Sequence, residues 1–146
     1  MSAQDNLAVA RGWAQAAFGQ HDLEAAAEFL APDWVGHWVG MPEGHGAEGF
    51  KRLAGEYLAA FPDMQVTVED ALEVDDKVVR RLSWTATHQG TFLGVSPTGR
   101  RVRGHGIVIL RISNGKIAEE WEMSDVLGLL QQLGAIPAFP SDAGPA

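Results

Sequence analysis

Cysteine is absent from this chain of 146 residues. Its absence excludes disulfide bonds, thiolate metal ligands and a cysteine nucleophile, and it fits the reducing cytoplasm. Long apolar runs are missing too, since no stretch approaches the roughly 18–20 residues of a membrane-spanning helix. Basic residues are few: 11 Lys and Arg stand against 19 Asp and Glu, for a formal net charge of −8. That balance argues against a general nucleic-acid binder, which needs a basic face.

The remaining composition predicts an ordinary globular protein. Apolar residues make up 46% of the chain and charged residues 21%, and this length is typical of one domain. The N-terminus lacks the basic region and apolar core of a secretory signal, so we expect a cytoplasmic protein. We place a single domain at 1–137. Residues 138–146 contain two prolines and little to bury, which predicts a flexible C-terminal tail.

The order of the predicted elements indicates an α+β fold. Apolar residues recur at helical spacing over 4–18 and 48–61, and Asp22 can cap a short helix that Pro32 ends. Strands are predicted over 33–39, 65–74, 78–88 and 101–112, and a last strand follows the hairpin signal Asn114-Gly115. A short helix over 126–133 comes next. Helices followed by consecutive antiparallel strands predict N-terminal helices packed on one face of a curved antiparallel sheet.

The last predicted strand ends with a carboxylate, Asp125. Side chains two apart share one face of a strand, so Asp125 shares a mostly apolar face with Met123 and Trp121. Two explanations fit this position. Asp125 either caps the helix that begins at Val126, or it acts as a general base in an apolar pocket, where lost hydration raises the pKa of a carboxyl group.

A possible partner for Asp125 depends on how the hairpin pairs. His105 lies between two glycines in the strand before the Asn114-Gly115 turn. If the loop has two residues, Ser113 pairs with Lys116 and His105 faces away from Asp125. If the loop has three residues and a glycine bulge, the pairing slips by one residue and His105 turns toward Asp125. With the two-residue loop, a bulge at the glycines beside His105 would still turn His105 toward Asp125. We therefore take His105 as the candidate partner.

Five further residues are candidates for contact with a ligand. Each has a structural alternative as a core or surface residue. No pair among the five histidines has the spacing of a zinc motif, and no glycine run matches a phosphate loop, so we predict no metal site. Arg80 and Arg81 point to opposite faces of their strand; one is expected in solvent and the other can pair with a carboxylate or hold an anionic group. The candidates are His37, Trp38, Arg81, His88 and Trp121.

Several segments together resemble the SnoaL-like polyketide cyclases, also called ester cyclases. The resemblance covers about residues 5–134, and its most specific part is the last strand, with Trp121, Asp125 and the ending Gln132-Leu133-Gly134. The other segments are 60–64, with Pro62-Asp63, together with 87–90, 96–100 and 114–120.

The resemblance implies a fold, a reaction and an assembly. The fold is the cone shared with nuclear transport factor 2, ketosteroid isomerase and limonene epoxide hydrolase, in proteins that are commonly homodimers or larger homo-oligomers. The reaction is a cofactor-independent intramolecular aldol condensation that closes a ring of an apolar polyketide ester, with Asp125 at the position of the acid/base aspartate. Alternatives are a hydroxylase, an isomerase or an epoxide hydrolase in the same fold, or a non-catalytic small-molecule binding protein.

Overall fold

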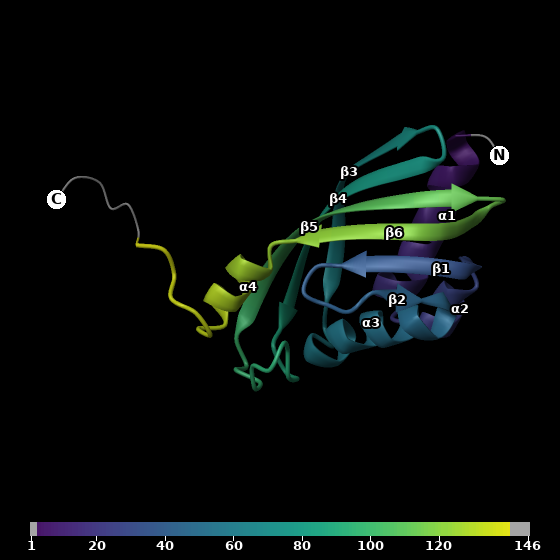
Figure 1. Cartoon of the computed structure of the whole chain (residues 1–146). Helices are drawn as coiled ribbons and strands as arrows, with labels where there is room; N and C mark the ends of the chain where they lie inside the picture. Colours follow the sequence, from purple (N-terminus) through teal and green to yellow (C-terminus); the bar gives the residue numbers. More distant parts are fainter. Residues whose placement is uncertain (1–2, 141–146) are drawn as a thin grey trace.

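The computed structural model of the chain describes residues 3–140 as one six-stranded sheet with helices against it (Figure 1). No helix in this part of the chain is long and apolar enough to cross a membrane. The predicted tail at 138–146 falls partly outside these residues, since 141–146 are not described. The elements are α1 (Ala3–Ala14), the π-helix η1 (Gln15–Gly19), α2 (Leu23–Ala27), β1 (Leu30–Trp38), β2 (Gly44–His45), α3 (Gly46–Ala60), β3 (Gln65–Val74), β4 (Lys77–Thr87), β5 (Arg101–Ser113), β6 (Lys116–Ser124) and α4 (Val126–Gln132).

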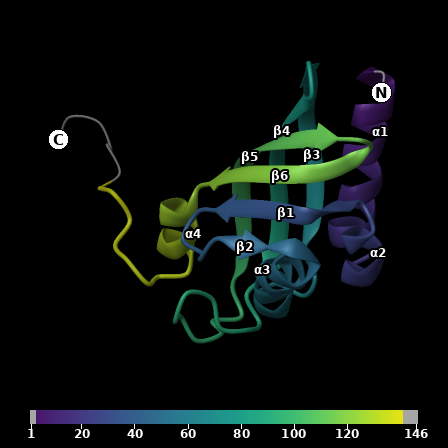
Figure 2. The ribbon, with the colours of Figure 1, turned by 45° about the vertical axis from the view of Figure 1, so that its right-hand side comes forward.

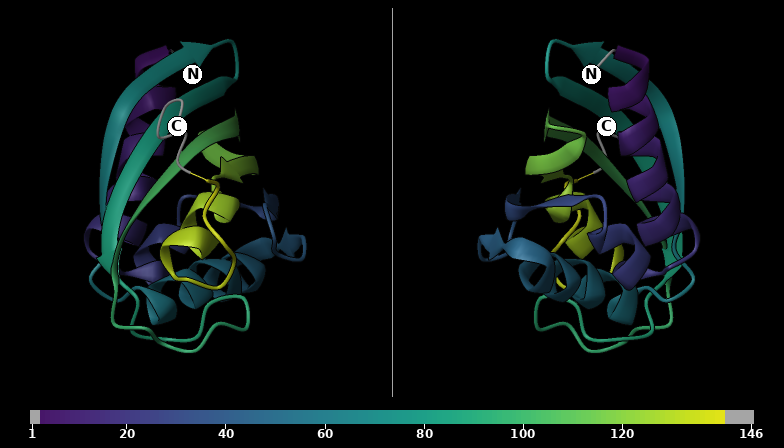
Figure 3. Two further views of the ribbon diagram at one scale, coloured as in Figure 1. Left: turned by 90° about the vertical axis from the view of Figure 1, so that its left-hand side faces the viewer. Right: turned by 90° about the vertical axis from the view of Figure 1, so that its right-hand side faces the viewer.

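The sheet is mixed, and its helices lie mainly on one side. Strand order is β2-β1-β6-β5-β4-β3. The four strands from β3 to β6 pair antiparallel in chain order, whereas β1 runs parallel to β6. Helix α3 lies beside β1 and β2, and α4 follows the far end of β6 (Figure 2). Helix α1 runs alongside the strongly curved β3 and β4 (Figure 3). The predicted α+β architecture is therefore confirmed, but the prediction of a wholly antiparallel sheet is wrong because β1 pairs parallel with β6.

The second helix is shorter than its apolar pattern predicts. Asp22 caps α2 as expected, accepting a hydrogen bond from the Ala25 amide at 3.0 Å. The helix ends at Ala27, however, and Leu30 begins β1. The amide of Ile117 donates to the Phe29 carbonyl at 2.9 Å, and Leu30 pairs with Ile117 across the parallel ladder. Pairing with a distant strand therefore overrides the local helical spacing, which made the prediction wrong at Leu30.

Large aromatic rings fill the space between α3 and the sheet. Trp34, Phe50 and Phe61 are almost fully buried, and the rings of Trp34 and Phe50 meet edge to face at 5.7 Å. Gly36 makes room for this packing, since a Cβ there would overlap the Trp34 indole. The core therefore lies between the inner face of the sheet and the helices, and it holds the sheet in its curved shape.

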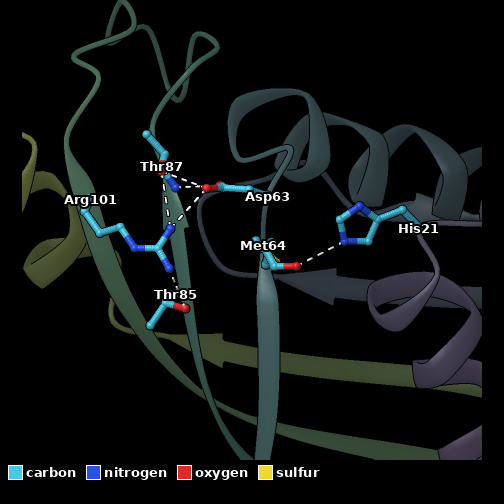
Figure 4. Close-up of polar contacts among 6 residues, drawn as sticks. All are labelled: His21, Asp63, Met64, Thr85, Thr87 and Arg101. Carbon is cyan, nitrogen blue, oxygen red and sulfur yellow. Dashed lines mark hydrogen bonds and ion pairs between the residues drawn. The ribbon is translucent and has the colours of Figure 1, made fainter.

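A polar cluster at residue 63 fixes the passage from α3 into β3 (Figure 4). The Asp63 carboxylate accepts from the backbone N and the Oγ1 of Thr87, at 2.6 and 2.7 Å, and from Arg101 at 3.1 Å. His21 Nε2 lies 3.1 Å from the Met64 carbonyl on the next residue. The Pro62-Asp63 segment thus joins the helical layer to β4 and β5.

The hairpin between β5 and β6 combines a two-residue turn with a bulge. Asn114 and Gly115 both have positive φ, and Ser113 pairs with Lys116 as predicted for the shorter loop. Ile112 pairs with Ile117, but Arg111 pairs with Glu119, so Ala118 is an extra residue in β6. Beyond it, the side chains of β6 exchange faces. Neither predicted register therefore continues along the strand.

Candidate active site

A cavity of about 70 Å³ lies between the helices and the inner face of the sheet. Its walls are mostly aromatic and aliphatic, with a few polar groups converging from β4, β6 and α3. Such a combination is typical of small-molecule sites. The lining residues are Trp13, Phe18, Trp38, Tyr57, Met64, Val66, Arg80, Leu82, Trp84, Gly106, Val108, Glu120, Glu122 and Ser124.

Two glutamates enter the cavity from β6 because of the bulge at Ala118. Counting by two from Ile117, which is buried, would place Glu119 inside; the extra residue instead turns Glu120 and Glu122 inward. Glu120 is 1% exposed and accepts a hydrogen bond from the indole Nε1 of Trp38. Burial raises the pKa of Glu120 to about 8, although Trp38 and Arg80 act in the opposite direction.

Glu122 is the carboxyl group best placed to react with a ligand. Its Oε2 is buried and has no hydrogen-bond partner among the described residues. Burial raises the pKa of Glu122, and the nearby Ser124 hydroxyl and Val39 amide offset part of that effect. A raised pKa makes a carboxylate a stronger base at neutral pH. Glu122 therefore has both the free oxygen and the basicity that a proton acceptor needs.

Hydroxyl donors lie next to Glu122. Tyr57, on α3, is the only tyrosine of the chain and is 7% exposed. Burial, together with the charge of Glu122, raises the pKa of Tyr57 to about 12, so the phenol keeps its proton. The Ser124 hydroxyl is buried and lies close enough to Glu122 and Tyr57 to lower the pKa of each. Both hydroxyls can therefore donate to an oxygen of a bound molecule that gains negative charge.

Two glycines of β5 shape this part of the cavity. A Cβ at Gly104 would overlap the indole of Trp84, so the glycine lets this ring lie against the strand. At Gly106, which lines the cavity, a Cβ would lie 3.3 Å from the Met123 carbonyl and 3.7 Å from Glu122 Oε1. The absence of a side chain at Gly106 thus leaves space in the cavity beside Glu122.

The predicted catalytic pair lies on the other face of the sheet. Asp125 is exposed and caps α4, since its Oδ1 accepts from the Gly128 amide at 2.9 Å. Its own amide donates to the His105 carbonyl at 3.0 Å, so the two residues are neighbours through the bulge at Ala118 and not through a three-residue loop. Asp125 and His105 line an open hollow on this face, together with Arg81 and Arg103. The catalytic roles of Asp125 and His105 remain predictions.

The other predicted ligand contacts are divided among three places. Trp38 lines the cavity, where it contacts Glu120. His37 and Trp121 stack on each other on the outer face, with ring centroids 5.8 Å apart. His88 is fully buried beside Phe61, and its Nδ1 accepts from the Thr98 amide at 3.1 Å. His88 does not line the cavity, so of the predicted contacts only Trp38 lies with the inward glutamates.

Some cavity residues could have been found from the sequence. In β4 the apolar frame Val78, Leu82, Trp84 and Ala86 includes one charged member, Arg80, which indicates that Arg80 rather than Arg81 faces the core. Glu120 and Glu122 carried no such signal, because nothing at Ala118 marks a bulge. Among the described residues, no group of three or more His, Asp or Glu side chains is arranged to hold a metal ion.

Comparison with known proteins finds relatives along most of the chain. The model of the SnoaL-like polyketide cyclase family matches residues 8–133. Aklanonic acid methyl ester cyclase DauD of Streptomyces sp. (strain C5) is 33% identical over 108 residues, which are 73% of this chain and 65% of that relative. The chain thus spans slightly less than two thirds of DauD. Nogalonic acid methyl ester cyclase of Streptomyces nogalater is 29% identical over 130 residues, 88% of this chain and 96% of that relative.

The fold also agrees with a solved structure. The crystal structure of AclR from Streptomyces galilaeus, a proposed hydroxylase, matches this chain with a TM-score of 0.84 and 35% sequence identity. The match covers 96% of this chain and 87% of AclR. Relatives of similar resemblance are thus named for different reactions, and the arrangement of the cavity must distinguish between them.

Proposed function

The chain belongs to the SnoaL-like polyketide cyclase family, and we propose that it closes a ring of a polyketide-type ester by an intramolecular aldol reaction without a cofactor. The observation that supports this proposal is the unpartnered Oε2 of Glu122 in an aromatic cavity, next to the hydroxyls of Tyr57 and Ser124. A base and hydroxyl donors in an apolar enclosure suit the formation and use of an enolate.

In the proposed reaction, Glu122 removes a proton from the carbon next to a carbonyl group. The resulting enolate carbon attacks a second carbonyl of the same molecule and forms a carbon–carbon bond. The electron pair of the attacked C=O moves to its oxygen, which Tyr57 or Ser124 stabilises by a hydrogen bond and which finally takes the proton from Glu122. All atoms are retained, so the product is an isomer of the substrate. Holding both carbonyls together supplies much of the rate.

The cavity must enlarge to admit a ring system. An apolar cavity of roughly 150 Å³ holds benzene, and this cavity is about 70 Å³. A second hollow of about 290 Å³ lies beside α1, and the two spaces share the side chains of Phe18, Val66, Arg80 and Leu82. Phe18 belongs to the π-helix η1, a type of helix that is often found at functional sites. We infer that displacement of Phe18 joins the two spaces when substrate binds.

Product mass tests the proposed reaction. The purified chain is incubated with aklanonic acid methyl ester or nogalonic acid methyl ester, the compounds in the names of its relatives, and the mixture is followed by liquid chromatography with mass spectrometry. We expect a product of unchanged mass and altered retention time, formed without added metal or cofactor. The Glu122→Gln protein is the control. Substrate that stays unchanged, or equal turnover by that variant, would contradict the proposal.

Hydroxylation is the second candidate, favoured by the resemblance to AclR. A hydroxylated product gains one oxygen atom, so its mass rises instead of staying constant. Oxygen insertion also needs molecular oxygen and a source of electrons. The same incubation under air and under nitrogen therefore separates the two reactions, because ring closure is independent of oxygen. Tight binding of either ester with no product would instead indicate a non-catalytic binding protein.

We also propose that the chain forms a homodimer through the outer face of the sheet. Ile107 and Met123 lie on this face and are 48% and 68% exposed. Exposed apolar side chains that lie together on a sheet are typical of contact surfaces. Light scattering after gel filtration should give twice the chain mass for the wild type and the single mass for Met123→Glu. A wild-type monomer at micromolar concentration would refute this assembly.

A further inference from the structure

The buried guanidinium group of Arg80 has no role in the reaction proposed above. Arg80 lies on β4 with 4% of its surface exposed, and it lines both the cavity and the hollow beside α1. Its neighbours in the inward frame, Val78 and Leu82, are aliphatic. Burial of a positive charge is unfavourable unless an anion or several hydrogen bonds compensate for the lost water.

The described side chains supply only part of that compensation. Among residues 3–140, no ion pair joins Arg80 to a carboxylate, and its Nε has no hydrogen-bond partner. The Trp13 ring lies 5.5 Å from the guanidinium carbon, close enough for a cation–π contact. Glu120 interacts with Arg80 over a longer distance, while its carboxyl group accepts from Trp38. The guanidinium group thus keeps its Nε–H donor without an acceptor, and Arg80 lines the cavity.

We propose that Arg80 binds an oxyanion of the ligand, either a carboxylate or the enolate of a 1,3-dicarbonyl group. The planar guanidinium presents paired N–H donors that match two oxygens of a delocalised anion. Both of these anions have two oxygens that share one negative charge. The ligand class that follows is an acidic aromatic or polyketide-type molecule, and only the polyketide part of this assignment rests on the proposed function.

The position of Arg80 also suits the proposed reaction. An enolate formed by Glu122 carries negative charge inside a cavity where water is scarce, and a fixed cation stabilises such charge strongly there. Arg80 comes from β4 and Glu122 from β6, with β5 between them in the sheet. The two side chains therefore approach a ligand from different strands, which allows one to hold an anionic oxygen while the other reacts with a neighbouring carbon.

Binding of small probes tests the inference without any turnover. Benzoate and benzamide have nearly the same shape and differ in charge. We expect the wild type to bind benzoate at least about tenfold more tightly than benzamide, as for other charge-assisted hydrogen bonds. The Arg80→Met protein should lose this preference. Arg52→Met, which removes an exposed arginine on α3, should keep it. 2-Acetylcyclohexane-1,3-dione serves as the enolate probe, and whichever anion binds more tightly identifies the natural group.

A direct measurement on the wild type avoids dependence on the folding of a variant. The Nε–H signal of Arg80 in a ¹⁵N spectrum, assigned by its loss in Arg80→Lys, should shift with benzoate and remain unchanged with benzamide. Equal binding of the two probes, binding of neither, or a preserved preference in folded Arg80→Met would overturn the inference. If benzoate is preferred but no polyketide ester is converted, the anion site stands and the proposed reaction fails.

Discussion

The two faces of the central sheet carry similar residue types in different surroundings. On the inner face, Glu120 and Glu122 are enclosed by tryptophans, and burial raises the pKa of both. On the outer face, Glu119 and Asp125 have partners at the surface: Glu119 accepts from His37 at 2.8 Å, and Asp125 caps α4. Carboxyl groups are thus buried in a cavity on one face, where we propose the reaction, and form surface contacts on the other.

We expect the largest difference between the two faces in the effect of a carboxyl substitution on kcat. Glu122→Gln removes the proposed base and keeps the size of the side chain, so kcat should fall by roughly 10²–10⁴-fold. Asp125→Asn keeps an oxygen that can accept the Gly128 amide, so kcat should change by less than about threefold. Steady-state turnover of the cyclised ester, with folding checked by circular dichroism, measures both.

The opposite result would restore the role that the sequence predicts for Asp125. A large loss in folded Asp125→Asn, with normal turnover by Glu122→Gln, would place the chemistry in the outer hollow with His105. A pH profile adds a second criterion. Because burial raises the pKa of Glu122, wild-type kcat/KM should increase with pH as this group loses its proton, above the range of an ordinary glutamate.

The stability of the protein should depend on pH because Glu120, on the inner face, has a raised pKa. The pKa of Glu120 is about 8 in the folded protein against an ordinary 4.5, so the folded state holds a proton that the unfolded state loses between these values. The free energy of unfolding of the wild type should therefore fall as pH rises through this window, by up to about 1.4 kcal/mol per unit. Glu120→Gln cannot titrate and still accepts from Trp38, so it should become the more stable protein toward about pH 9.

Urea unfolding at about pH 5, pH 7 and pH 9 measures this effect. Asp125→Asn is the matched control, because its carboxyl group lies on the outer face; its stability should run parallel to that of the wild type. If the stability of Glu120→Gln also changed with pH in parallel with that of the wild type, Glu120 would titrate as an ordinary glutamate. Carboxyl groups on the inner and outer faces would then not differ in this respect.

The sequence predicts the elements better than it predicts which face a side chain occupies. The helix over 48–61 and the strands over 65–74 and 101–112 agree with α3, β3 and β5. The patterns of α3 and β5 reflect their own packing, whereas the mostly exposed β3 pairs with the adjacent strand β4. The pairing Ser113 with Lys116 follows from the local chemistry of Asn114-Gly115. These features depend on residues close together in the chain, so the sequence alone determines them.

Which side chains line the cavity depends instead on one extra residue of β6 in its pairing with β5. Ala118 shifts β6 by one place, and a shift of one residue exchanges its inner and outer side chains. No glycine or proline marks Ala118, and the ladders that β6 forms with β5 and with β1 both change register near this residue. The same shift turns Asp125 out of the apolar interior and places it beside His105, which already faces outward on β5. Arg80, in a strand without a bulge, could have been recognised from its aliphatic frame.

Packing gives a smaller contrast between the faces. A methyl group at Gly104 would overlap the Trp84 ring, so Gly104→Ala should lower the free energy of unfolding by about 1–3 kcal/mol. His105→Ala, one residue further along the same strand, removes an exposed side chain and should change it by less than about 0.5 kcal/mol. Thermal unfolding compares the two directly. Equal shifts would mean that Trp84 moves aside freely and that the inner face is loosely packed.

The smallest effect is expected for the outer pair of His37 and Glu119. The hydrogen bond from His37, followed by that from Arg111, lowers the pKa of Glu119 below its ordinary 4.5. A lowered pKa in the folded state gives stability that is present above this value and is lost as pH falls through the lowered pKa. The Glu119 side chain is 25% exposed, so water and salt screen the pair, and Glu119→Gln should cost less than about 1 kcal/mol at neutral pH. The deficit should disappear in acid and shrink in high salt. Glu48→Gln, which removes an 89% exposed carboxylate paired with Lys51, should show no deficit. A larger cost that persists in acid would indicate that Glu119 supports the sheet by packing rather than by charge.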